Sequence, residues 1–167
     1  VARSGWSKQG GFEIYLMDGT QGMRLWNLVK EAGQPWDIGP GGPNFAERVE
    51  SGLLSFGGDT DARTNPFEVR LGKYIDLGVA AKVIGIEALR RIHAGGPKRQ
   101  QLGLVLDGDQ PTTLGFNWNE IHCDGHSIGH LTNCVWSWRL RRNIGFALVA
   151  GTCRAGERVE ITREGQI

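Results

Sequence analysis

The Gly95-Gly96-Pro97 break separates two stretches of the chain whose apolar residues follow different patterns. Before the break, apolar residues recur at helical spacing in several segments; after it, short apolar runs are divided by turn residues. Glycine followed by proline is a strong signal for the end of a helix. We therefore expect an α+β fold with two domains, residues 1–95, a mixed sheet with helices, and residues 96–167, a small β-barrel.

The segment 11–16 alternates in polarity and predicts a strand from which Glu13 and Tyr15 project together. A carboxylate among apolar neighbours is costly to bury unless it is paired. Glu13 therefore either faces solvent on a half-exposed sheet or accepts hydrogen bonds from adjacent N–H groups of a heterocycle. The rings of Trp6 and Tyr15 either pack in the core or line a flat-ring pocket with Glu13.

Three helices are predicted in the first stretch, and two of them have a polar residue that can cap the amino terminus. Asp18 or Thr20 precedes a helix that runs to about Ala32, and Gly33 is suited to end it. Asn44 precedes a short helix that ends near Gly52, with Glu47 at the third position of a capping box. The third helix covers residues 84–93.

After the break, several short strands are predicted within about 70 residues, as in a small barrel or sandwich. The strands cover residues 102–106, 144–149 and 158–162, with a hairpin that turns at Asp124-Gly125. Trp136 and Trp138 stand two residues apart, so we expect both on one face, in the barrel core.

Composition excludes several classes of protein. The net charge is +1, and neither stretch is a basic arm, so nucleic acid is not an expected partner. No apolar run approaches the roughly 20 residues of a membrane-spanning helix. The three cysteines are an odd number at wide spacings, which favours a reduced cytoplasmic protein over a disulfide framework. The start at Val1-Ala2-Arg3, without methionine, leads us to expect truncation or processing.

Four potential metal ligands surround the Asp124-Gly125 turn, namely His122, Cys123, His126 and His130. Zinc sites need ligands that converge on one point. Side chains in a hairpin alternate between two faces, so these four cannot easily converge. We therefore expect structural or surface roles for them and no metal site.

Several segments, in collinear order over nearly the whole chain, resemble the glycine-cleavage T-protein (aminomethyltransferase) family. Residues 3–14 resemble its R-x-G-Y-x-G-x-x-G-x-E-I segment, and residues 47–57 its L-R-L-E-A-G…Y-G segment. Residues 65–68 match its T-P-x-E, and residues 84–89 match I-G-x-E-A-L. Residues 127–129 and 143–145 are similar to parts of its C-terminal barrel. The resemblance implies the carboxy-terminal portion of a folate-binding enzyme.

Within this family, three segments look like the dimethylsulfoniopropionate demethylase branch: S-K-Q-G-G-F-E-I-Y, P-N-x-x-E-R-x-E-S and N-P-F-E. Asn44 stands where the T-protein has an arginine that helps to hold its substrate, and Trp6 replaces the loop tyrosine. The branch implies transfer of a methyl group from the sulfonium compound to tetrahydrofolate. An aminomethyltransferase, another folate-dependent O- or N-demethylase and a non-catalytic binding module remain alternatives.

The resemblance also implies roles for individual residues. Glu13 and Trp6 would bind tetrahydrofolate, Glu13 at the edge of the pterin, and Tyr15 and Asn44 would lie at the substrate. Aromatic faces hold a sulfonium cation with about 0.5–2 kcal/mol.

The departures from the family pattern set limits on activity. The family's amino-terminal region, with the aspartate near folate N5, has no counterpart in this sequence, so we expect no catalytic residue and no turnover in this chain alone. We expect that region to dock on apolar core residues that this chain leaves exposed. Without it, we expect the chain to aggregate or to form a homodimer.

Overall fold

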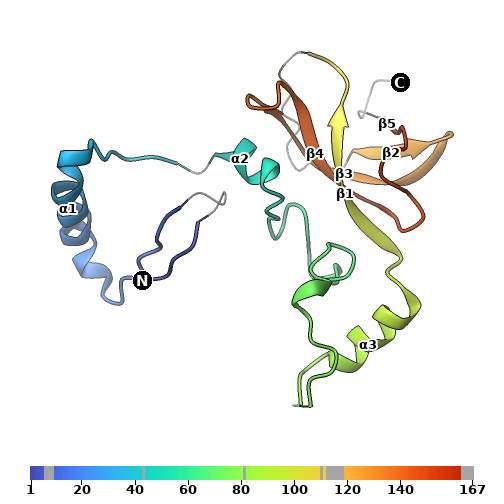
Figure 1. Cartoon of the computed structure of the whole chain (residues 1–167), viewed down its shortest axis with the longest axis horizontal. Helices are drawn as coiled ribbons and strands as arrows, with labels where there is room; N and C mark the ends of the chain where they lie inside the picture. Colours follow the sequence, from blue (N-terminus) through green and yellow to red (C-terminus); the bar gives the residue numbers. More distant parts are fainter. Residues whose placement is uncertain (6–9, 43, 81, 110, 112–118, 163–167) are drawn as a thin grey trace. The chain divides into compact units, whose positions relative to one another are not determined.

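The computed structural model describes residues 1–5, 10–42, 44–80, 82–109, 111 and 119–162. The chain divides into two compact units, Val1–Leu53 and Leu54–Ile167, and each is described by itself (Figure 1). The first unit is helical and the second contains an antiparallel sheet, so the predicted α+β class is confirmed. No helix within the described residues combines the length and apolar character needed to cross a membrane.

Within its described residues, the first unit contains two α-helices; α2 begins where the sequence predicts, whereas α1 begins at Gly22, after a 3-10 turn. Asp18 caps the turn that leads into α1, because its carboxylate accepts a hydrogen bond of 3.0 Å from the Thr20 amide. Asn44 caps α2 by accepting from the amides of Ala46 and Glu47. The elements are η1 (Gly19–Gln21), α1 (Gly22–Gly33), η2 (Gln34–Trp36) and α2 (Phe45–Glu50).

The strand predicted for residues 11–16 is not formed, so that prediction was wrong. Glu13 makes one isolated antiparallel bridge with Ala2, through two backbone hydrogen bonds of 2.9 Å. The apolar side chains beside it are open to solvent: Phe12 is 70 % and Ile14 49 % exposed. Alternating side-chain polarity is the pattern of a half-buried strand, but a strand forms only where a neighbouring strand pairs with it along its length. Here only one pair is made among the described residues.

Helix α1 carries the apolar stripe that the sequence predicts, but none of its residues is buried. Met23 is 70 % and Trp26 49 % exposed. Most helical stability in proteins comes from packing an apolar face against another element. The described residues of the first unit leave this face without such cover.

The second unit begins with an irregular segment that leads to α3 (Ile86–Gly95), with the short turn η3 (Gly72–Tyr74) between. The helix starts two residues later than predicted, because Gly85 has a φ of 83° and interrupts the helical path. Arg90 holds the preceding loop by donating from Nε to the Leu77 carbonyl at 2.9 Å. The predicted domain boundary after residue 95 falls between α3 and the first strand, and the division into domains stays a prediction.

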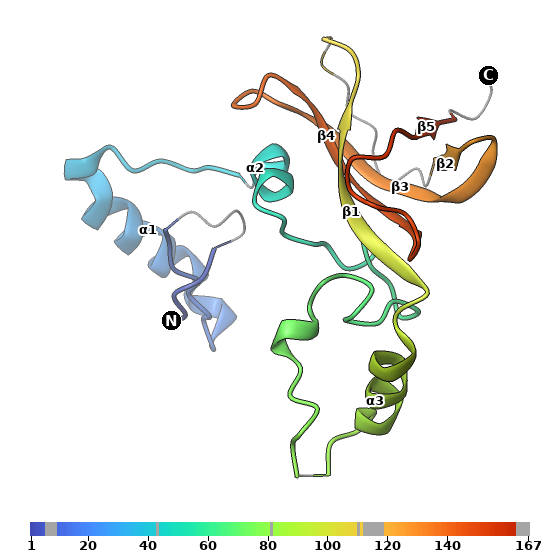
Figure 2. The same ribbon diagram turned by 45° about the vertical axis from the view of Figure 1, so that its right-hand side comes forward.

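A five-stranded antiparallel sheet forms the core of the second unit, in the order β1-β4-β3-β2-β5. Its strands are β1 (Arg99–Leu106), β2 (Glu120–Cys123), β3 (His126–Ser137), β4 (Arg142–Ala150) and β5 (Glu160–Ile161). Register shifts between Ile121 and His122, and between Leu131 and Asn133, mark irregularities in β2 and β3. Such bulges bend a strand, and β3 curves along its length in Figure 2.

The β2–β3 hairpin turns at Asp124-Gly125, as the sequence predicts. Both residues have positive φ, 50° and 76°, which is the requirement of a type I′ turn. Buried apolar residues of the sheet form the core cluster: Leu102, Ile121, Leu131, Cys134, Ala147 and Val149. The core placement predicted for Trp138 was wrong. Its ring is 76 % exposed and meets Trp136 edge-on, because the chain has already left β3 at Ser137.

Two polar contacts fix the segment before α3 to the sheet. The fully buried Asp59 carboxylate accepts hydrogen bonds from the Thr132 hydroxyl at 2.9 Å and from the Asn133 amide, both on β3. Glu68 pairs with Arg99 at the start of β1, with Nε to Oε1 at 2.9 Å. These contacts join residues more than thirty positions apart, so they decide where the irregular segment lies on the sheet.

Replacing Asp59 with alanine is expected to lower the free energy of unfolding by about 3 kcal/mol, because the Asn133 side-chain amide and the Ser55 backbone amide lose the carboxylate that accepts from them. Urea denaturation followed by circular dichroism measures this change. The matched control is Asp109→Ala, which removes an exposed carboxylate and should shift the free energy by less than about 0.5 kcal/mol. Equal effects of the two substitutions would contradict the anchoring role of Asp59.

Candidate functional site

The Glu13 carboxylate lies at the centre of a small polar group in the first unit. The backbone bridge between Ala2 and Glu13 brings residue 4 back towards residue 13. The Ser4 hydroxyl and the Tyr15 hydroxyl then both donate to Glu13 Oε2, the second at an O···O distance of 3.2 Å. The side chains of Glu13 and Tyr15 therefore lie together, as predicted, although the described residues form no regular strand there.

The carboxylate changes the acidity of its neighbour. The hydrogen bond to Glu13, and then the negative charge of Glu13, raise the pKa of Tyr15 above its ordinary value of 10.0. Ionisation of the phenol would remove this hydrogen bond and place two negative charges side by side. Tyr15 therefore stays a hydrogen-bond donor through the neutral range and helps to orient Glu13.

The group is accessible to a ligand. Glu13 is exposed, and Tyr15 is 68 % exposed. An ionised carboxylate has about four lone-pair sites on two oxygens. No described residue donates to Oε1, so an incoming pair of N–H donors can be accepted beside the two hydroxyl groups. A heterocycle with adjacent N–H groups fits this donor and acceptor pattern.

Of the other two predicted site residues, Asn44 is described by the structure and Trp6 is not. Trp6, the second predicted cofactor contact, lies outside the described residues. Asn44, the predicted substrate contact, uses its side-chain oxygen to cap α2, with N···O distances of 3.0 and 3.3 Å. Its assignment to a substrate stays a prediction, and the structure adds a local role for the side chain.

Ser4 is a member of this group that the sequence analysis missed. Nothing in its neighbourhood distinguishes it from other surface serines, because its contact with Glu13 depends on the return of the chain at the Ala2 bridge. The Arg-Ser-Gly segment before the glycine-rich loop was the only signal available.

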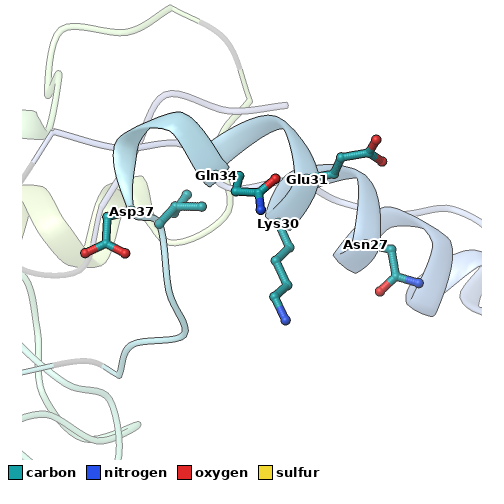
Figure 3. Close-up of a pocket in the computed structure, with 6 residues that line it drawn as sticks. Asn27, Lys30, Glu31, Gln34 and Asp37 are labelled. Carbon is teal, nitrogen blue, oxygen red and sulfur yellow. The ribbon is translucent and has the colours of Figure 1, made fainter.

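A hollow in the first unit has a volume of about 360 Å³ and lies along α1 and η2. Figure 3 shows that Asn27, Lys30 and Glu31 point in different directions from the helix and not at a common centre. Converging polar groups are what distinguish a binding site from a surface depression. This hollow is therefore not the candidate site.

Among the described residues, no three histidine, cysteine, aspartate or glutamate side chains gather closely enough to hold a metal ion. The side chains of His122 and Cys123 instead contact residues near the end of the chain. His122 lies 3.0 Å from the Thr162 hydroxyl, whereas the Cys123 sulfur lies 3.8 Å from the Arg158 carbonyl oxygen. All three cysteines fall in described stretches, and none forms a disulfide.

Comparison with known proteins gives matches along most of the chain. The family model described as the GCVT N-terminal domain matches residues 1–78. The model described as the glycine cleavage T-protein C-terminal barrel domain matches residues 99–167.

Two curated relatives and one solved structure illustrate the similarity. The chain is 40 % identical over 149 residues to a dimethylsulfoniopropionate demethylase of Ruegeria pomeroyi, covering 89 % of this chain and 40 % of that protein. It is 33 % identical over 162 residues to an aminomethyltransferase of Herpetosiphon aurantiacus, covering 96 % and 43 %. A glycine cleavage system aminomethyltransferase T from Bartonella henselae has the same fold, with a TM-score of 0.77 at 23 % identity over 98 % of this chain and 45 % of that one.

The chain thus spans less than half the length of each of these proteins.

Substitution of Glu13 by glutamine is expected to lower the pKa of Tyr15 towards 10.0, since the negative charge is removed and a neutral amide oxygen is a weaker acceptor. The chain has two tyrosines, so the titration is made in a Tyr74→Phe background, where tyrosinate absorbance reports Tyr15 alone. Glu31→Gln, on α1, serves as the control and should leave the curve unchanged. An identical curve for Glu13→Gln and its parent would contradict the hydrogen bond.

Proposed function

Because the chain belongs to the glycine cleavage T-protein family, we propose that it forms the carboxy-terminal part of a tetrahydrofolate-dependent enzyme that moves a one-carbon group from a small molecule. The most specific form of this proposal is a demethylase that transfers a methyl group from dimethylsulfoniopropionate to tetrahydrofolate in the cytoplasm. The observation that carries it is the 40 % identity to a dimethylsulfoniopropionate demethylase over 89 % of this chain.

The residue pattern supports the demethylase over its rival within the family. Two aminomethyltransferases among the relatives of this chain are 30 % and 34 % identical to it, compared with 40 % for the demethylase. Asn44 also stands where the T-protein pattern has an arginine. An aminomethyltransferase, or another folate-dependent O- or N-demethylase, is the second candidate, and a non-catalytic binding module is the third.

Glu13 is the residue that we assign to the cofactor. Its exposed carboxylate, held by the hydroxyls of Ser4 and Tyr15, suits the adjacent N–H donors of a pterin. Tetrahydrofolate, when bound, supplies the acceptor for the transferred group. The protein then mainly holds donor and acceptor in line, which is how positioning accelerates a transfer between two bound molecules. Tyr15, which lies beside Glu13, is assigned to the substrate together with Asn44, and Trp6 is assigned to the cofactor.

Another region of the same protein is proposed to complete the enzyme. The exposed apolar face of α1 supports this, because Met23 and Trp26 would otherwise remain in water. The length of the relatives supports it as well, since they are more than twice as long as this chain. We expect the 167 residues alone to give no turnover and to aggregate or dimerise through this face.

In a longer form of the protein that includes the preceding region, Glu13→Ala is expected to weaken tetrahydrofolate binding by more than about tenfold, because a charge-assisted pair of hydrogen bonds is lost. Isothermal titration calorimetry measures the affinity. Glu31→Ala, which removes another exposed carboxylate of the same unit, is the control. Equal affinities of the wild type and Glu13→Ala would remove Glu13 from the cofactor site.

The choice of methyl donor is tested by offering the longer protein dimethylsulfoniopropionate, dimethylglycine and a methoxylated aromatic compound separately. We expect methyltetrahydrofolate to form with the sulfonium compound alone, since a positively charged sulfur is a good leaving group. Product is followed by chromatography. Turnover with only one of the other donors would select the second candidate function, and demethylation by the 167 residues alone would show that the additional region is dispensable.

A further inference from the structure

The Tyr15 hydroxyl connects two residues that the proposed function assigns to different ligands. It donates to Oε2 of Glu13 at an O···O distance of 3.2 Å. Glu13 is assigned to tetrahydrofolate, whereas Tyr15 is assigned to the methyl donor. A hydrogen bond between two binding sites lets the occupant of one site change the affinity of the other. The acceptor sites of the Glu13 carboxylate therefore bear on how the two reactants bind together.

Both lone pairs of Glu13 Oε2 are engaged within the protein. An ionised carboxylate has about four lone-pair sites, about two on each oxygen. The Ser4 and Tyr15 hydroxyls both donate to Oε2, and no described residue donates to Oε1. Two adjacent N–H donors can share Oε1, but the stronger arrangement is a parallel fork in which each donor has an oxygen of its own. To form that fork, one of the two hydroxyls must leave Oε2.

The geometry at Glu13 favours Tyr15 as the hydroxyl that leaves. Its O···O distance of 3.2 Å is longer than the roughly 2.5–3.0 Å of well-formed O–H···O bonds, so little is lost when this bond breaks. Its ring is 68 % exposed and is free to turn in solvent. Ser4 is held more firmly, because the backbone bridge between Ala2 and Glu13, with two hydrogen bonds of 2.9 Å, returns its segment to the carboxylate.

A Tyr15 hydroxyl that leaves Glu13 is a donor in need of a new acceptor. The phenol is protonated at neutral pH, since its ordinary pKa is 10.0 and Glu13 raises the pKa further. The acceptor that it leaves is a carboxylate, so another carboxylate can replace it. Dimethylsulfoniopropionate and dimethylglycine, the methyl donors considered above, each carry one. Tyr15 can therefore give the methyl donor the hydrogen bond that Glu13 otherwise receives.

We propose that Tyr15 makes the two reactants bind in order: tetrahydrofolate takes Oε2 of Glu13 and releases the Tyr15 hydroxyl, which then binds the carboxylate of the methyl donor. This order rests on the proposed function and adds to it a requirement for a carboxylate on the methyl donor. Because coupling between two binding sites is reciprocal, each reactant raises the affinity for the other. The methyl donor is then held firmly only when an acceptor for its methyl group is present.

The test uses the longer form of the protein and 5-deazatetrahydrofolate, which keeps the N–H donors of the pterin but has no N5 to accept a methyl group. Isothermal titration calorimetry measures the affinity for dimethylsulfoniopropionate with and without this analogue. The analogue is expected to raise that affinity by about tenfold in the parent and by less than about twofold in Tyr15→Phe. Tyr74→Phe, which alters another exposed tyrosine, should behave as the parent does.

The methyl ester of dimethylsulfoniopropionate is the matched ligand control. It keeps the sulfonium group but lacks the negative charge of the carboxylate, so the analogue should not raise its affinity. If the sulfonium compound binds in neither condition, the same comparison is made with dimethylglycine and its methyl ester. Equal affinities for the methyl donor with and without the analogue, or a tenfold increase that survives in Tyr15→Phe, would overturn the proposed order.

A spectroscopic measurement on the unaltered protein keeps the test independent of whether Tyr15→Phe folds. With tyrosine labelled with carbon-13 at Cζ, the NMR signal of Tyr15 reports the hydrogen bond of its hydroxyl. The analogue alone should shift this signal, and the methyl donor alone should not. Binding of the analogue without a shift at Tyr15 refutes the order of binding but not the folate site, whereas failure of the parent to bind the analogue refutes the proposed function itself.

Discussion

The buried carboxylate of Asp59 is the interaction on which the arrangement of the second unit depends. It is fully buried and accepts hydrogen bonds from Thr132 and Asn133, in the middle of the longest strand. The segment that contains it has little regular structure, so its position is decided by such contacts and not by ladders of its own. The ion pair between Glu68 and Arg99 fixes the same segment to the first strand. Together, the Asp59 hydrogen bonds and the Glu68–Arg99 ion pair hold this irregular segment on the sheet.

Features that depend on neighbouring residues could be predicted from the sequence. The caps at Asp18 and Asn44 and the turn at Asp124-Gly125 are local, since the side chain or backbone angle and its partner lie within three residues. Features that depend on pairing between residues far apart in the sequence could not be predicted. The alternation of residues 11–16 satisfies a strand pattern, but only one pair is formed there. Trp138 follows the β3 alternation in sequence but falls just beyond the last paired residue, Ser137.

In the candidate site, too, contacts between neighbouring residues could be predicted and contacts between distant residues could not. Glu13 and Tyr15 are two residues apart, so their contact could be anticipated from the spacing. Ser4 reaches the same carboxylate only because the chain returns at the Ala2 bridge, and no local pattern encodes that return. The role of Asn44 as a cap could be read from its position before an apolar segment, while its assignment to a substrate came from resemblance alone. Local geometry thus identified the carboxylate, and the ligand proposed for it comes from the family resemblance.

The position of Asp59 in the chain also has a consequence for biosynthesis. Its acceptor oxygen and the Thr132 hydroxyl are separated by 73 residues. A ribosome that adds about 5–20 residues per second needs roughly 4–15 s to cover that distance. During this interval the Asp59 segment has been synthesised, but the strand that anchors it does not yet exist. Vectorial synthesis therefore leaves this carboxylate hydrated until β3 has been made, so it cannot lose its water before then.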